Sequence, residues 1–169
     1  MSIRRVLASN VGGKSQVIGD TSGISNAFEH VHGFDPALLW KTAPGAQVAV
    51  VQSPLSGQNV LPAAGGTSLL IVTFPPDANM MDIADPEAAG AEYLQRIPGL
   101  AEKFEPENPG MHRTETTDYG IVLEGEVVCI FDNGEVTLKA GDVLVQDHTR
   151  HGWSNRTNAP AKVAFVLIG

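Results

Sequence analysis

The last third of the chain is a regular succession of short apolar runs, each closed by a turn. The runs cover residues 119–123, 127–131, 136–138, 143–145 and 163–168. Asp132-Asn133-Gly134 is the strongest turn signal between them, because Asn-Gly tolerates positive φ at both central positions of a hairpin. Runs of this length with these breaks predict short strands and leave no room for a helix. We therefore expect an antiparallel β-meander here.

The first half of the chain is also strand-like, but less regular. Its candidate strands are 3–8, 15–18, 37–41 and 67–74. A connection rich in Gly, Pro, Ser and Gln covers residues 44–66. Loops of this length inside a compact domain are usually functional or mobile.

One stretch reads as a helix. Asp85 is placed to cap it, Pro86 occupies the favoured first position, and residues 98–99 end it, before a second short helical turn up to Phe104. Its apolar positions share one face: Ala89, Tyr93, Ile97 and Leu100. We expect this face to pack on the barrel or on a second subunit. A lid over a binding site is the alternative.

The length of 169 residues suits one well-filled core and is short for two domains. We therefore expect a single domain over residues 1–169. Within it, residues 1–84 hold the N-terminal strands and the long loop, 85–105 the helical insert, and 106–169 the motif region described below.

The charge of the chain argues against two classes of partner. Eleven Lys and Arg against nineteen Asp and Glu give a net charge of −8, which repels phosphate backbones and anionic lipid. No stretch approaches the roughly 20 apolar residues that cross a bilayer, and the short apolar run after Arg5 is no secretory signal. The chain is expected to bind neither nucleic acid nor membrane and to be cytoplasmic. Its single cysteine, Cys129, lies in an apolar run and is expected to be a buried hydrophobe.

Three residues of the predicted meander carry metal-binding chemistry. His112, Asp118 and His151 stand on runs that the turns fold back on one another. Two imidazoles and a carboxylate are what a small β-barrel would use to hold a metal.

The surroundings of these residues resemble the two motifs of the cupin family. In that family the first motif reads H-x-H, three or four residues, E, six residues, G, and the second ends in a His followed three residues later by Asn. Residues 110–125 are similar to the first and residues 141–155 to the second. Matched to the motifs, His112 takes the place of the first ligand His, Asp118 that of the Glu, and His151 that of the second-motif His.

The sequence also departs from the family pattern. Thr114 stands where the second His of H-x-H would be, Asp147 replaces the usual Pro, and Pro106 replaces the leading Gly. The loop before His151 is one residue shorter. Because residues two apart share a strand face, Thr114 is expected to line the same pocket as His112.

The resemblance implies a fold and a cofactor. The fold is an all-β, cupin-type antiparallel β-barrel of jelly-roll character with a short helical insert, often paired as a homodimer. The cofactor is a divalent metal, Fe, Mn, Ni or Zn, held by His112, Asp118 and His151. Gly120 would leave room for a ligand beside Asp118, or would form a bulge that closes the barrel. The alternative is a barrel without metal, in which the two histidines are hydrogen-bonded in a polar pocket.

Other chemistry-bearing residues are set aside. His30 and His32 lack the strand frame of a cupin motif, and His148 falls in a predicted turn. Residues 12–15 imitate the end of a phosphate-binding loop, but the first glycine of that pattern is missing.

Two functions follow from the resemblance to small bacterial single-domain cupins. One is a metalloprotein that acts on a small aromatic or carboxylic compound by dioxygenation, decarboxylation, isomerisation or lyase chemistry. The other is a metal-free barrel that binds a small ligand without catalysis. Fold resemblance does not choose between them.

Overall fold

The computed structural model describes residues 3–45 and 57–169, and residues 46–56 of the predicted long loop lie outside the described part. The elements follow one another in this order: β1 (Ile3–Val11), β2 (Lys14–Ile24), β3 (Asp35–Thr42), β4 (Thr67–Phe74), α1 (Asp77–Met81), α2 (Pro86–Arg96), the 3-10 turn η1 (Ala101–Lys103), β5 (Thr117–Glu124), β6 (Glu126–Phe131), β7 (Gly134–Lys139), β8 (Val143–Asp147), β9 (Gly152–Ser154) and β10 (Ala161–Ile168).

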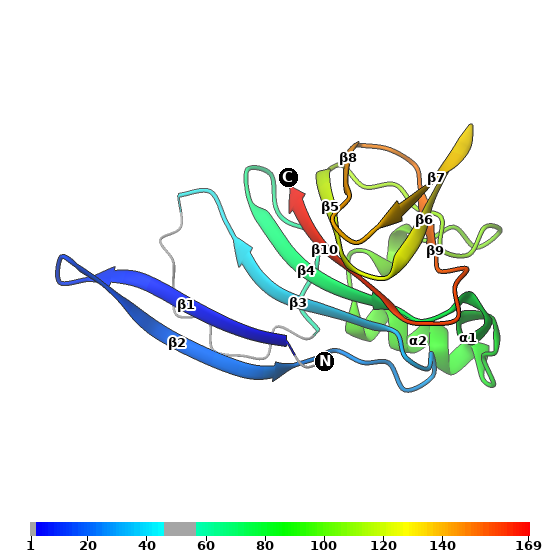
Figure 1. Cartoon of the computed structure of the whole chain (residues 1–169), viewed down its shortest axis with the longest axis horizontal. Coiled ribbons are helices and arrows are strands. Elements are labelled where there is room, and N and C mark those ends of the chain that lie inside the picture. The colour runs from blue at the N-terminus through cyan, green and yellow to red at the C-terminus, as the bar shows by residue number, and fades with distance from the viewer. Residues whose placement is uncertain (1–2, 46–56) are drawn as a thin grey trace.

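Two antiparallel sheets build the body of the molecule. The larger has the strand order β3-β4-β10-β5-β8 and the smaller the order β7-β6-β9 (Figure 1). Apolar side chains from both sheets form one core, with Val122 and Val163 from the larger sheet and Val127 and Cys129 from the smaller. The prediction of an all-β fold of antiparallel strands with a short helical insert is confirmed.

The predicted strands of the meander are observed with small changes at their ends. The strand that sequence reasoning missed is β9, whose three residues are too few to show a period. The helix missed was α1, which buries no residue and has no side-chain cap. In the first half, β1 and β2 are longer than expected, and their turn is made by Gly12 and Gly13, both at positive φ. The residues that imitate a phosphate-binding loop therefore belong to a tight hairpin.

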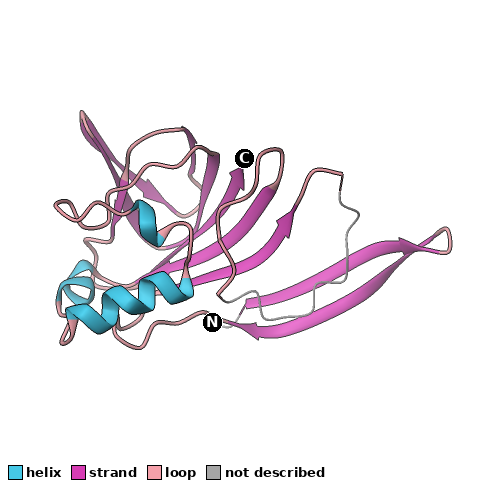
Figure 2. Cartoon of the chain, turned by 180° about the vertical axis from the view of Figure 1, so that it is seen from behind, coloured by secondary structure: helices cyan, strands magenta, loops and turns pink. Residues whose placement is uncertain are grey.

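The β1–β2 hairpin forms a sheet of its own and extends away from the body (Figures 1 and 2). Its base is tied to β3 by Arg5, whose guanidinium donates a hydrogen bond to the carbonyl of Leu39 at 2.9 Å and lies over the ring of Trp40. Toward its tip, Val11 and Val17 are exposed. These contacts of Arg5 attach the base of the hairpin to the larger sheet.

The helices lie together at the end of the molecule opposite to the hairpin (Figure 2). Asp85 caps α2 as predicted, accepting a hydrogen bond from the backbone N–H of Ala88 at 3.0 Å. Ala89 and the C-cap residue Ile97 are buried in the core, and Tyr93 packs against it. The apolar face of α2 therefore packs on the barrel, the first of the expected arrangements.

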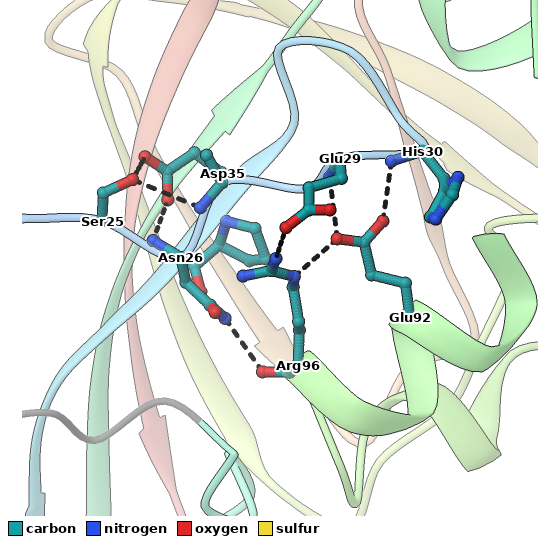
Figure 3. A network of polar contacts seen from close by, with 9 residues as sticks. Ser25, Asn26, Glu29, His30, Asp35, Glu92 and Arg96 are labelled. Atoms are coloured by element: carbon teal, nitrogen blue, oxygen red, sulfur yellow. Dashed lines mark hydrogen bonds and ion pairs between the residues drawn. The ribbon is translucent and has the colours of Figure 1, made fainter. Parts of the chain in front are cut away.

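A buried carboxylate fixes α2 to the loop before β3 (Figure 3). Glu92 is only 6% exposed, and it accepts hydrogen bonds from the backbone N–H of Glu29 at 2.8 Å and of His30 at 2.9 Å. Arg96, one turn later, donates to the same carboxylate at 2.5 Å. Burial opposes ionisation of Glu92, but these donors outweigh it and lower its pKa. An ionised side chain thus sets the position of the helix.

No helix within residues 3–45 and 57–169 combines the length and the apolar character that a membrane crossing requires.

Candidate functional site

The chain from residue 112 to residue 122 places every second side chain on the inner face of the fold. His112, Thr114, Thr116, Asp118 and Gly120 are all buried, while the residues between them are exposed or half-buried. This alternation begins before the first residue of β5 and continues into the strand, where side chains alternate between the two faces. The result is a polar stripe, residues 112–118, that runs along the inner face toward the apolar core.

His112 and His151 lie side by side on two chain segments that pair with each other. The backbone N–H of each donates to the carbonyl of the other at 2.9 Å, and the ring centroids are 4.4 Å apart. Both residues are buried. This isolated bridge, lying just outside the regular strands, brings together two residues that are 39 positions apart in the sequence.

Each imidazole of the pair is oriented by a backbone carbonyl. Nδ1 of His112 lies 3.1 Å from the carbonyl oxygen of Gly110, and Nδ1 of His151 lies 3.1 Å from that of Thr149. A carbonyl only accepts, so Nδ1 carries the proton and Nε2 keeps its lone pair. Burial lowers the pKa of both imidazoles, to about 4 for His151, where the neighbouring His112 adds to the effect. The pair is therefore neutral at pH 7, with both Nε2 atoms able to accept.

Asp118 faces inward from β5, where it is opposite Gln146 of β8. Its Oδ1 is buried with no hydrogen-bond partner among the described residues, and so is Oε1 of Gln146. Burial raises the pKa of the Asp118 carboxyl, and a hydrogen bond from Thr116 opposes the shift. Two residues that pair across β5 and β8 thus each carry a buried oxygen without a partner among the described residues.

Thr114 is buried beside His112, but its hydroxyl is engaged. Oγ1 of Thr114 lies 2.8 Å from Oγ1 of Thr116. The residue that replaces the second family histidine is therefore part of a short hydroxyl chain that leads to Asp118.

The place of a side chain at Gly120 is taken by aromatic rings. A Cβ there would meet a ring carbon of Phe165 at 3.3 Å and one of Trp153 at 3.5 Å. Gly120 pairs in regular register with Phe165 and Leu144, so it forms no bulge. Its place beside a bound ligand stays a prediction.

The residues that are present fit a metal only in part. The histidine pair offers two imidazole nitrogens, and Thr114 offers no free hydroxyl. Within residues 3–45 and 57–169, no three His, Cys, Asp or Glu side chains form a group that could hold a metal ion. The three-residue centre of His112, Asp118 and His151 stays a prediction.

A closed circuit of aromatic side chains passes through the histidine pair. Neighbouring ring centroids are 4.4 to 6.2 Å apart around this aromatic circuit: Phe34, Tyr93, Phe104, His112, His151, Trp153, Phe74 and back to Phe34. Its members come from the loop before β3, from the helical insert, from β4 and from the motif strands. The helical insert thus contributes a wall next to His112.

An ion-pair group lies next to the circuit. Arg150, which precedes His151, donates to both carboxylate oxygens of Glu105 at 2.6 Å and also to Asp132. Glu105 directly follows Phe104, and its N–H donates to the carbonyl of Met111 at 2.9 Å. The end of the helical insert is thereby fixed to the segments that carry both histidines.

The remaining sequence interpretations have clear outcomes. Asn155 is buried and satisfies backbone carbonyls of Phe74 and Ala159, so it supports the strand end as a structural residue. His30 and His32 lie on an exposed loop, and His148 is exposed and bonded to Asp147. Cys129 is fully buried, which raises its pKa to about 12.

Sequence reasoning missed Gln146 and Phe104. The signal for Gln146 was available, since it is a polar residue at an inward position of an alternating strand. The sequence carried no signal for Phe104, because its contact with His112 depends on how the helical insert folds back onto the sheets.

Comparison with known proteins places the motif region in a family. Residues 101–168 match the family model described as "Cupin domain". Phomopsin biosynthesis cluster protein C′ of Diaporthe leptostromiformis is 50% identical over 60 residues, which cover 34% of this chain and 32% of that protein. The cupin-domain-containing oxidoreductase virC of Hypocrea virens is 44% identical over 62 residues, covering 34% and 32%. The chain thus spans about a third of the length of these relatives.

Solved structures show weaker similarity. A Cupin 2 conserved barrel domain protein from Salinispora arenicola is 13% identical, with a TM-score of 0.42 over 80% of this chain and 76% of that one. A sugar phosphate isomerase from a cupin superfamily of Silicibacter pomeroyi is 16% identical, with a TM-score of 0.44 over 86% and 69%.

Proposed function

Because residues 101–168 of this chain are a cupin domain, we propose that the protein is an enzyme of small-molecule biosynthesis that binds an organic compound on the inner face of that domain. Its relatives support this setting: three carry the words "biosynthesis cluster protein" in their names, and others are named cupin-domain-containing oxidoreductases. The polar stripe of residues 112–118 supports the location.

The observation that carries the proposal is the histidine pair. Both imidazoles are buried, adjacent and fixed through Nδ1 to backbone carbonyls, which leaves both Nε2 atoms for a ligand. A core histidine with only a structural role usually has both ring nitrogens satisfied or one exposed to water. Here no described residue hydrogen-bonds to either Nε2. His112 and His151 would therefore contact the bound compound, with both Nε2 atoms able to accept hydrogen bonds from it.

A second candidate follows from the same two nitrogen atoms. Neutral imidazoles with Nδ1 bonded to a carbonyl are the form in which histidine ligates metals. Under this hypothesis His112 and His151, with Asp118 as the predicted third ligand, would hold Fe, Mn, Ni or Zn. The metal would polarise a substrate carbonyl or activate oxygen, giving the dioxygenase, decarboxylase, isomerase or lyase chemistry that the resemblance implies. Without a metal, the interior would bind the compound through hydrogen bonds alone.

Elemental analysis of protein purified without an affinity tag separates the two candidates. If metal is bound at the pair, the metal content will be stoichiometric and will disappear in the His112→Ala, His151→Ala double variant. His148→Ala is the matched control, because His148 is exposed. Failure to take up Fe(II), Mn(II), Ni(II) or Zn(II) after reconstitution would reject the metal candidate. Loss of small-molecule binding in the double variant alone would still support the first proposal.

We further propose that the protein is a homodimer in which a second copy covers the β1–β2 hairpin. A two-stranded hairpin is marginally stable by itself in water, and here Val6, Val11 and Val17 are 49%, 49% and 63% exposed. The nearby strand β3 is the outer strand of its sheet. Light scattering should give a dimer mass for the full chain and a monomer mass after removal of residues 1–24. A monomeric full chain would contradict the proposal.

A further inference from the structure

We propose that the compound bound at this site is an aromatic alcohol or phenol, whose hydroxyl lies between Asp118 and Gln146 and donates to one of the two, while its ring contacts the aromatic circuit. This inference rests on the proposed function, since it names the substrate class of the same site. It follows from two independent features of the inner face.

The first feature is an acceptor row across the larger sheet, a set of buried oxygen atoms that can accept hydrogen bonds and have no partner among the described residues. Ser68 of β4 pairs with Leu167 of β10, which pairs with Asp118 of β5, which pairs with Gln146 of β8. All four residues are more than nine-tenths buried. Oγ of Ser68, Oδ1 of Asp118 and Oε1 of Gln146 have no hydrogen-bond partner among the described residues. Three of the four residues in one row thus present an unsatisfied polar atom to the interior.

Buried polar groups in folded proteins are nearly always satisfied, so a cluster of exceptions requires an explanation. The Gln146 amide makes only long contacts through Nε2, at 3.9 Å to Sγ of Cys129 and 3.4 Å to Oγ1 of Thr149. Directly opposite side chains on paired antiparallel strands lie about 5 Å apart at Cβ. One hydroxyl placed between Asp118 and Gln146 could therefore donate to either oxygen.

The chemical character of the row selects the ligand. Oδ1 of Asp118, Oε1 of Gln146 and the two Nε2 atoms of the histidine pair all accept hydrogen bonds. A carboxylate or phosphate group would bring further acceptor oxygens next to the buried Asp118 carboxyl and would supply no proton to its unpartnered oxygen. A hydroxyl supplies the missing donor and brings no charge into the buried interior, where an unpaired charge is costly.

The second feature is the aromatic circuit, in which the histidine pair joins rings from the loop before β3, the helical insert, β4 and β9. Aromatic rings prefer edge-to-face or offset contacts with one another. Phe104 meets His112 at an interplanar angle of 85° and Trp153 meets His151 at 88°, both edge-to-face. A planar ring extends such an arrangement better than a flexible chain does. Trp153 also lies over Gly120, where an added Cβ would meet its ring at 3.5 Å, and Gly120 is two residues from Asp118 on the same face, so the two features are adjacent.

Four probes with related skeletons test the inference on the full chain: benzyl alcohol, toluene, benzoate and hexan-1-ol. Binding is followed by NMR, using the imidazole signals of His112 and His151 together with the affinity of each probe. We expect benzyl alcohol to bind at least about tenfold more tightly than toluene or hexan-1-ol, and benzoate to bind least.

Variants of the row give the second arm. Gln146→Met and Asp118→Asn should each weaken benzyl alcohol binding about fivefold or more while leaving toluene binding unchanged. Glu115→Gln is the matched control, because this residue is exposed between Thr114 and Thr116. Circular dichroism checks that each variant is folded, and the comparison of probes on the wild-type chain stands without any variant.

The outcomes separate this inference from the proposed function. Equal affinity for benzyl alcohol and toluene, or no effect of both variants, would mean that the row holds only water and would overturn the inference. Tighter binding of hexan-1-ol or benzoate at the histidine pair would also overturn it, yet would leave the proposed function standing. If no probe shifts either imidazole signal, both fail.

Discussion

Replacing Glu92 by Gln should destabilise the protein strongly, although the two side chains have the same shape. The carboxylate accepts from two backbone N–H groups and from the Arg96 guanidinium, and the side chain is 6% exposed. In the variant, one oxygen becomes an NH₂ group that faces a donor. The bond to a charged acceptor is lost and a buried donor is left unsatisfied, which costs about 3 kcal/mol. For a chain of this size the melting temperature should fall by about 6 to 12 °C.

The pH dependence of this effect has a defined sign. The folded-state pKa of Glu92 is lowered, so its ionised form stabilises the fold above the ordinary glutamate pKa of about 4.3. This contribution is lost as the pH falls through the lowered folded-state value. The stability gap between wild type and Glu92→Gln should therefore be full at pH 7 and should shrink below about pH 4.

Urea unfolding of both proteins at pH 7 and at several values below pH 4 measures this gap. Glu87→Gln is the matched control, because Glu87 lies exposed in the first turn of the same helix. Equal stability of wild type and Glu92→Gln at pH 7 would refute the reasoning, as would a gap that persists unchanged at acid pH. Since α2 also carries Tyr93 of the aromatic circuit, we expect a loosened helix in the Glu92→Gln variant to disturb the ring contacts at the candidate site.

Three further outcomes are expected. Gly125→Ala should lower stability by about 1 to 3 kcal/mol, because φ is +75° and a Cβ would meet the Ala161 Cβ at 3.0 Å. Gly90→Ala in α2 should instead raise stability by about 0.5 to 1 kcal/mol, because a Cβ there meets nothing within 4 Å. Thermal melts compare both variants with the wild type. A Gly125→Ala variant more stable than Gly90→Ala would contradict both predictions. Cys129 should resist iodoacetamide at pH 8 in the native protein and react after unfolding, because it is buried and its pKa is raised to about 12. Mass spectrometry detects the adduct. Rapid labelling of the native protein would contradict the prediction and show that the core opens.

The sequence determined those features that depend on neighbours along the chain. The alternation of apolar residues and the turn residues were sufficient to predict the strands β5, β6, β7, β8 and β10. The period of a strand and the residues that end it are local properties of the sequence. The start and the end of α2 could also be predicted, from Asp85 as its N-cap and from Pro98, which ends the helix. The inward positions of His112, Thr114 and Asp118 also followed, because side chains alternate along an extended backbone.

Only the tertiary structure decided what these inward side chains meet. The pairing of His112 with His151 across an isolated bridge sets their 4.4 Å separation, while Thr114 is bonded to Thr116 and Gly120 is covered by Trp153 and Phe165. The aromatic circuit and the acceptor row join residues from distant segments, and strand register and the folding of the insert bring them together. Those contacts are fixed by long-range packing, on which a local pattern carries no information.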